Sequence, residues 1–81
     1  MNDPSVTIIV LNWNGKDLTL ECLDSLYKVN YSNYNILVVD NKSSDGSVES
    51  FHKQYPNISV LELDKNYGYA EGNNRGFKYL N

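Results

Sequence analysis

The stretch Ile36–Gly46 restricts the possible folds more than any other part of the chain, because an apolar run ends there on an acid and a turn. Apolar residues lead directly into Asp40, and Asn, Lys, Ser, Asp and Gly follow. Such a run is typical of a strand buried on both faces of a parallel sheet. Asp40 would then lie at the carboxyl edge, where open α/β folds bind ligands. Ser44 or Asp45 could accept hydrogen bonds from the first free N–H groups of the following helix.

Strands and helices are expected to alternate along the whole chain. The predicted elements are a strand at Val6–Leu11, a helix at Lys16–Lys28, a polar connector at Asn30–Asn35, the strand that ends on Asp40, a helix between Gly46 and Pro56, a strand at Ile58–Leu63 and a helix at Ala70–Leu80. This order favours a three-layer, Rossmann-like half of a doubly wound α/β domain with a parallel sheet. The first strand should lie beside the second, with the third outside it. With 81 residues, the chain should form one partial domain over residues 1–81.

Periodicity predicts which helical faces are buried. In the first helix Leu18, Cys22 and Leu26 recur every four positions and should form the buried face with Leu23 and Tyr27. Cys22 is therefore expected to be a small buried hydrophobe, since a single cysteine cannot form an internal disulfide.

Composition excludes several classes of protein. The formal net charge is −3 and the basic residues are scattered, whereas a nucleic-acid-binding surface usually carries clustered Lys and Arg. The first residues lack the basic start and apolar run of a signal peptide, and no segment approaches the ~20 apolar residues of a membrane span. We therefore expect a cytoplasmic protein that does not span a membrane.

Three loops should meet at the carboxyl edge of the sheet, at 12–15, 40–45 and 64–68. Asp40 is the strongest candidate there, because a carboxylate can accept two hydrogen bonds from a ribose or from a base N–H. It could instead be an ordinary strand-end or turn residue. Asn12 and Asn14 each carry a donor and an acceptor that could bind a base edge, but they are equally ordinary turn formers.

Other candidate chemistry is sparse. Gly68, Gly72 and Gly76 recur every four residues and should give a smooth helical face that a sheet, a loop or a diphosphate can approach. Glu62 and Asp64 are interpreted as solvated acids and not as metal ligands. No catalytic residue and no metal ligand is predicted.

Four ordered motifs resemble glycosyltransferase family 2 enzymes of the GT-A fold, at the amino-terminal end of their catalytic domain. They are V-T-I-I-V-L-N-W-N-G, E-C-L-D-S-L, I-L-V-V-D-N-K-S-S-D-G-S and N-Y-G-Y-A-E-G-N-N-R-G. The resemblance covers nearly the whole chain and is strongest to the rhamnosyltransferase-like branch.

The resemblance implies a nucleotide-binding role for several positions. Leu11 and Asn12 match residues that line the base, Asp40 matches the acid that bonds to base or ribose, and Asp45 matches a mostly structural turn residue. Asn73 stands where many members have Arg. The expected nucleotide-binding set is Leu11, Asn12, Asn14, Asp40, Asn41, Asn66, Gly68 and Asn73.

The family relationship also implies an activity. Members transfer a sugar from a nucleotide diphosphate sugar to a glycan or lipid-linked acceptor, with inversion, often in cell-wall or polysaccharide synthesis. Their D-x-D motif, which binds Mg²⁺ or Mn²⁺, and their catalytic base follow later than residue 81. We therefore expect no cofactor in this chain, a divalent metal only in a full-length enzyme, and inactivity alone; such an enzyme could also attach peripherally to a membrane.

A different function is also consistent with the sequence. The chain could be a small non-catalytic α/β module that binds nucleotide weakly or serves as an interaction subunit. In either case the apolar first strand has one edge without a predicted partner, so self-association through that edge is expected.

Overall fold

The computed structural model describes residues 6–28 and 34–80, so positions 30–33 of the predicted connector lie outside the described residues. The elements are β1 (Val6–Asn12), α1 (Lys16–Tyr27), β2 (Tyr34–Asp40), α2 (Ser47–Gln54), β3 (Ser59–Glu62) and α3 (Gly68–Leu80). The strands pair in parallel in the order β1-β2-β3. Every predicted strand and helix is confirmed, with β2 and α3 each beginning two residues earlier than expected, so that positions 34 and 35 of the predicted connector belong to β2.

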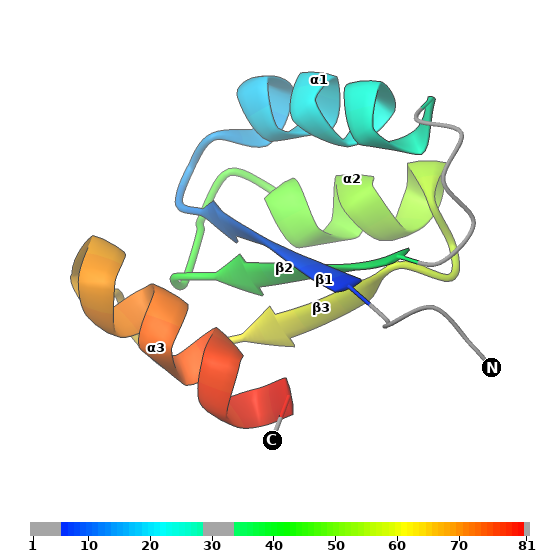
Figure 1. Ribbon diagram of the computed structural model, residues 1–81. Helices are drawn as coiled ribbons and strands as arrows, with labels where there is room; N and C mark the ends of the chain where they lie inside the picture. The colour runs from blue at the N-terminus through cyan, green and yellow to red at the C-terminus, as the bar shows by residue number, and fades with distance from the viewer. Residues whose placement is uncertain (1–5, 29–33, 81) are drawn as a thin grey trace, which may run out of the picture.

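The sheet separates two helical layers. Figure 1 shows α1 and α2 on one face and α3 on the other. Along β2, Ile36 and Val38 pack into a cluster with Leu23 and Phe51, whereas the alternate residues pack on the opposite face. That second cluster contains Leu37, Val39 and Leu63. Residues 36–40 are all buried, which confirms a strand buried on both faces.

The buried face of α1 differs from the predicted one. Leu23 is buried, but Leu18 is 75% exposed and Cys22 is also exposed. The face turned to the sheet carries Thr19 and Leu23. The predicted face is therefore correct at Leu23 and Leu26, which pack in the core, and wrong at Leu18, Cys22 and Tyr27, which are exposed. The recurrence missed Thr19, a polar residue that is buried through a hydrogen bond from its hydroxyl to Asn12.

β1 is less buried than predicted. Residues 7–11 are only half-buried, and Val6 is 45% exposed. Within the described ranges β2 is the only strand that pairs with β1, so the other side of β1 carries unpaired backbone groups.

Two glycines allow α3 to approach the sheet. A Cβ on Gly72 would lie 2.8 Å from both Leu11 Cδ1 and Asn41 Nδ2, and one on Gly76 would lie 2.6 Å from Val39 Cγ2. The sequence left a sheet, a loop or a diphosphate as the partner of this helical face. The sheet lies against both Gly72 and Gly76. Gly68 has a different role, since its φ of 84° is a conformation that few other residues adopt.

Gly76→Ala should lower the free energy of unfolding by about 1–2 kcal/mol, because the new methyl group must displace the buried Val39 side chain. This change is the net one, after the gain of about 1 kcal/mol in helix propensity that alanine brings has been subtracted from the cost of overpacking. Chemical denaturation measures the change. Asn74→Ala, on the exposed face of the same helix, is the control and should be neutral or slightly stabilising. A more stable Gly76→Ala variant would contradict the close packing of α3 on β2.

Candidate functional site at the carboxyl edge of the sheet

The three loops expected to carry chemistry lie together at one edge of the sheet. Asn12 pairs with Asp40, and Asp40 pairs with Glu62, so the strands end side by side. Backbone bonds extend this pairing beyond the strands: Asn41 N donates to Asn12 O, and Leu63 N donates to Asp40 O, both at 2.8 Å.

Asp40 is held by three donors. Its Oδ1 accepts hydrogen bonds from Asn12 Nδ2 at 2.8 Å and from Ser43 Oγ at 2.7 Å, and its Oδ2 accepts one from Ser43 N at 2.9 Å. The carboxylate is only 2% exposed. A buried carboxylate is tolerated where donors replace its water, and these three donors fix its orientation.

Asn12 uses its side chain to join β1, α1 and β2. Its amide group donates to Asp40 and to Ser43 Oγ, and its Oδ1 accepts a bond from the Thr19 hydroxyl at 2.7 Å. These two acceptors are themselves 2.7 Å apart, so they share one amide hydrogen. The proposed contact of Asn12 with a base stays a prediction.

Asn14 links the first two loops from the solvent side. Its backbone N donates to Ser43 Oγ at 2.9 Å, and its Oδ1 accepts a bond from Ser44 N at 2.7 Å. Asn14 has a φ of 47°, which asparagine tolerates better than most residues. Within residues 6–28 and 34–80 its amide nitrogen has no hydrogen-bond partner, so this exposed residue can still offer a donor.

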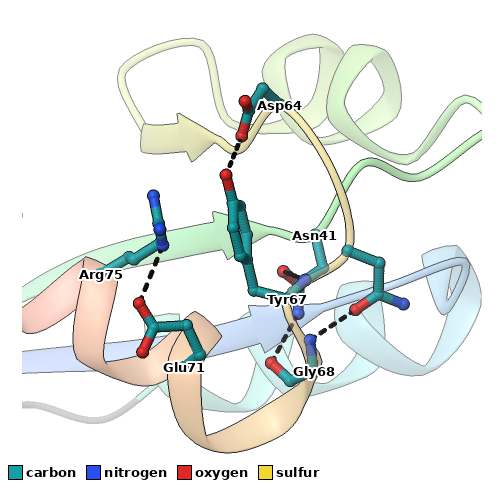
Figure 2. A network of polar contacts seen from close by, with 7 residues as sticks. Asn41, Asp64, Tyr67, Gly68, Glu71 and Arg75 are labelled. Carbon is teal, nitrogen blue, oxygen red and sulfur yellow. Dashed lines mark hydrogen bonds and ion pairs between the residues drawn. The ribbon is translucent and has the colours of Figure 1, made fainter.

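Asn41 connects the second loop to the third. Its Oδ1 accepts a bond from Tyr67 N at 3.2 Å, and its Nδ2 donates to Gly68 O at 3.1 Å. In Figure 2 the Asn41 amide lies against the turn that starts α3. Asn66 Oδ1 also accepts a bond from Gly68 N at 2.8 Å, so two asparagines fix the entry into the helix.

Tyr67 forms the centre of a charged cluster around the third loop (Figure 2). Its hydroxyl donates to Asp64, which lowers the pKa of that carboxyl below its ordinary range and raises the pKa of the phenol. Arg75 lies 3.7 Å from the ring centroid and pairs with Glu71 at 3.0 Å. This cluster ties the exposed side of the loop to α3.

Asp45 joins the starts of two helices. Its Oδ1 accepts hydrogen bonds from the Ser47 N and Oγ, and its Oδ2 accepts one from Lys16 N at 3.1 Å. The Ser47 side-chain bond is the largest of the effects that hold the pKa of Asp45 below its ordinary value. The predicted hydrogen bond from the start of the helix to Asp45 is confirmed, although the N-cap residue itself is Gly46. The contact with α1 is an addition, and Ser44 uses only its backbone N–H.

A pocket of about 640 Å³ opens beside Asp40, between the ends of β2 and β3 and the start of α2. Its charged lining consists of the carboxylates of Asp40, Glu49 and Glu62 and the ammonium of Lys42. Of the eight residues expected to bind nucleotide, Asp40 alone lines this pocket. Leu11 and Asn73 are half-buried, and Leu11 packs in the cluster on the α3 face.

Ser43 was not predicted as a site residue, although its hydroxyl contacts three of the residues around the edge. Its only sequence signal was its place in the turn after Asp40. Thr19 was also missed, because a lone threonine on a helix carries no pattern.

The described residues do not fit a metal ion. No three His, Cys, Asp or Glu side chains within residues 6–28 and 34–80 gather closely enough to hold one. Asp40 already accepts three hydrogen bonds, and Asp64 accepts one from the Tyr67 hydroxyl. No chemical step through a metal can therefore be assigned to these residues.

Comparison with known proteins identifies relatives along the whole described chain. The family model described as glycosyl transferase family 2 matches residues 7–81. A poly(ribitol-phosphate) beta-glucosyltransferase of Bacillus spizizenii is 37% identical over 68 residues, covering 78% of this chain and 11% of its own length. Glycosyltransferase AglE of Haloferax volcanii is 32% identical over 80 residues, covering 93% of this chain and 26% of its own.

A solved structure supports the GT-A assignment. The mannosyltransferase PcManGT from Pyrobaculum calidifontis, in complex with GDP-Man and Mn²⁺, is similar with a TM-score of 0.81 and 28% identity. The match covers 96% of this chain and 25% of that one. The chain thus spans about a quarter or less of the length of these relatives. None of the helices described here has the length and apolar character needed to cross a bilayer.

Asp45→Asn should flatten the acid side of the stability profile. The folded state holds the Asp45 pKa down, so its stabilising effect is complete above the unfolded pKa, about 4, and is lost as the pH falls through the lower folded pKa. The pKa of Asp64 is also lowered, but Asp64 is present in both the wild type and the variant, so it does not affect the difference in stability between them. Urea denaturation should show the variant less stable at pH 7 by about 1 kcal/mol, the size of a lost helix cap, with the gap closing toward pH 3. A gap that does not change with pH would contradict this role.

Proposed function

The chain belongs to glycosyl transferase family 2, and we propose that its three strand ends form the nucleotide side of a glycosyltransferase donor site. The complete enzyme would move a sugar from a nucleotide diphosphate sugar to a glycan or lipid-linked acceptor, with inversion. The observation that carries this proposal is the buried Asp40 carboxylate, held in one orientation at the mouth of a pocket on the sheet's carboxyl edge.

The proposed contacts fall into two groups. Leu11, Asn14, Asp40, Asn66, Gly68 and Asn73 would touch the nucleotide. Asn12 and Asn41 belong to the same set and are as buried as Asp40, but unlike Asp40 they do not line the pocket. Their side chains are hydrogen-bonded to neighbouring loops, so their main contribution would be to hold the edge together.

Charge favours the nucleoside over the diphosphate at the pocket beside Asp40. Three carboxylates and one ammonium line it, so a diphosphate placed there would meet net negative charge. A ribose or a base offers N–H and O–H donors that match the carboxylates. The diphosphate would then point away from this pocket, toward parts of the enzyme that bring a Mg²⁺ or Mn²⁺ ion.

Transfer by residues 1–81 alone is not expected. We propose that they form a partial domain whose catalytic base and metal ligands belong to further sequence. The lack of a cluster of His, Cys, Asp or Glu that could hold a metal within residues 6–28 and 34–80 supports the part of this proposal that concerns the metal. We also propose membership in the rhamnosyltransferase-like branch, on the strength of the four motifs together and of Asn73, which stands where many members have Arg.

A second candidate function is an interaction subunit. The observation that favours it is the open side of β1, where no described strand pairs. Asn12 O accepts a bond from Asn41 N, so Asn12 directs its backbone groups toward β2. Alternate residues face the other way, so Thr7, Ile9 and Leu11 present free N–H and C=O groups to a second strand.

Asp40→Asn should weaken binding of UDP or GDP, whichever the chain binds, by about tenfold or more, because a hydrogen bond to a charged acceptor is lost. Isothermal titration calorimetry measures the affinity, and circular dichroism checks the fold. Glu21→Gln removes one exposed carboxylate from α1 and should bind as the wild type does. Equal affinities for the wild type and Asp40→Asn would contradict the proposed site.

Thr7→Pro should reduce self-association, because it removes an N–H on the open side of β1 and leaves the bonds to β2 in place. Light scattering across a concentration series should show a mass that rises with concentration for the wild type and stays near 9.3 kDa for the variant. Thr7→Val, which keeps the N–H, is the control. A wild type that stays monomeric throughout would exclude pairing through this edge.

A further inference from the structure

We infer that Ser43 is a positioning residue that orients the Asp40 carboxylate toward a ligand, an inference that rests on the proposed nucleotide site. Ser43 belongs to no predicted set of binding residues. Its place is set by the turn after Asp40, in which Lys42 adopts a φ of 64° and returns the chain over the end of the strand.

The Ser43 hydroxyl donates its one hydrogen to Asp40 Oδ1 at 2.7 Å and accepts a bond from Asn14 N at 2.9 Å. Asn12 Nδ2 lies 2.8 Å from Asp40 Oδ1 and 3.1 Å from Ser43 Oγ, so one amide hydrogen is shared between these two oxygens. Ser43 lines the pocket, but its only hydrogen is committed to Asp40, so it has no donor left for a ligand. Ser43 therefore acts chiefly by orienting the carboxylate.

The same count shows what Asp40 can still offer. A carboxylate has about four acceptor sites, two on each oxygen. Oδ1 already accepts from Asn12 and Ser43, whereas Oδ2 accepts only from Ser43 N. One acceptor site on Oδ2 is left unused by the described residues, and this is the site that we expect to accept a hydrogen bond from a ligand.

Removing the Ser43 hydroxyl would leave the Asp40 carboxylate in place but would hold its orientation less firmly. Ser43 N would still donate to Oδ2, and Asn12 would still donate to Oδ1. The amide of Asn12 and the backbone N of Asn14 would each lose an acceptor. Asp40 would then be able to turn about its own side chain, and the free site on Oδ2 would no longer point in one direction.

The test compares Ser43→Ala with Ser43→Thr, which keeps the hydroxyl, and with Ser44→Ala, in which only a neighbouring exposed hydroxyl is removed. By calorimetry with UDP and GDP, Ser43→Ala should bind about fivefold or more weakly. Ser43→Thr should recover most of that loss, and Ser44→Ala should match the wild type. In an Asp40→Asn background, Ser43→Ala should weaken binding no further.

An equal loss from Ser43→Ala in both backgrounds would overturn the inference, as would wild-type affinity in Ser43→Ala. If Asp40→Asn binds like the wild type, the proposed site itself is wrong. A second measurement needs no nucleotide: the Asp40 carboxyl ¹³C resonance of the free protein should move in Ser43→Ala and stay in place in Ser44→Ala. An unmoved resonance in Ser43→Ala would overturn the inference even if the chain binds neither nucleotide.

Discussion

The hydrogen bond from Asn12 to Asp40 is the interaction on which the carboxyl edge depends. It joins the last residues of β1 and β2 where both side chains are almost fully buried. Buried polar groups must be paired, so each remaining atom of this pair recruits a further partner: Thr19 from α1 and Ser43 from the turn. Among the described residues every buried side-chain polar atom has a partner. The loops at this edge are therefore fixed by satisfied bonds and not by packing alone.

The position of the strand ends explains why this polar group can exist inside a small domain. Apolar residues of β2 alternate between two clusters, and Gly72 and Gly76 let α3 lie directly on the sheet. The acid is placed where this core ends and solvent begins. Asn41 then extends the same arrangement to the third loop, so that hydrogen bonds join the loops after all three strands.

Sequence patterns predicted the strands, the helices, the strand order and the place of Asp40, because apolar runs and turn residues depend on local chemistry. They failed where burial depends on a distant partner. Leu18 and Cys22 fit a helical stripe but are exposed. The face of the helix turned to the sheet carries Thr19 instead, which donates a hydrogen bond to Asn12. Ser43 and Asn41 act through a turn whose shape rests on a left-handed Lys42, which no periodicity reveals. The nucleotide contacts themselves stay predictions.

The most direct test of the nucleotide site is a map of backbone amide chemical shifts in the ¹⁵N-labelled chain as UDP and then GDP are added. The proposed site predicts that the largest changes fall at residues 11–15, 40–43 and 66–68, the three loops joined through Asn12, Ser43 and Asn41. Shifts centred on the opposite, amino-terminal edge of the sheet near Tyr34, or no shifts with either nucleotide at millimolar concentration, would contradict it.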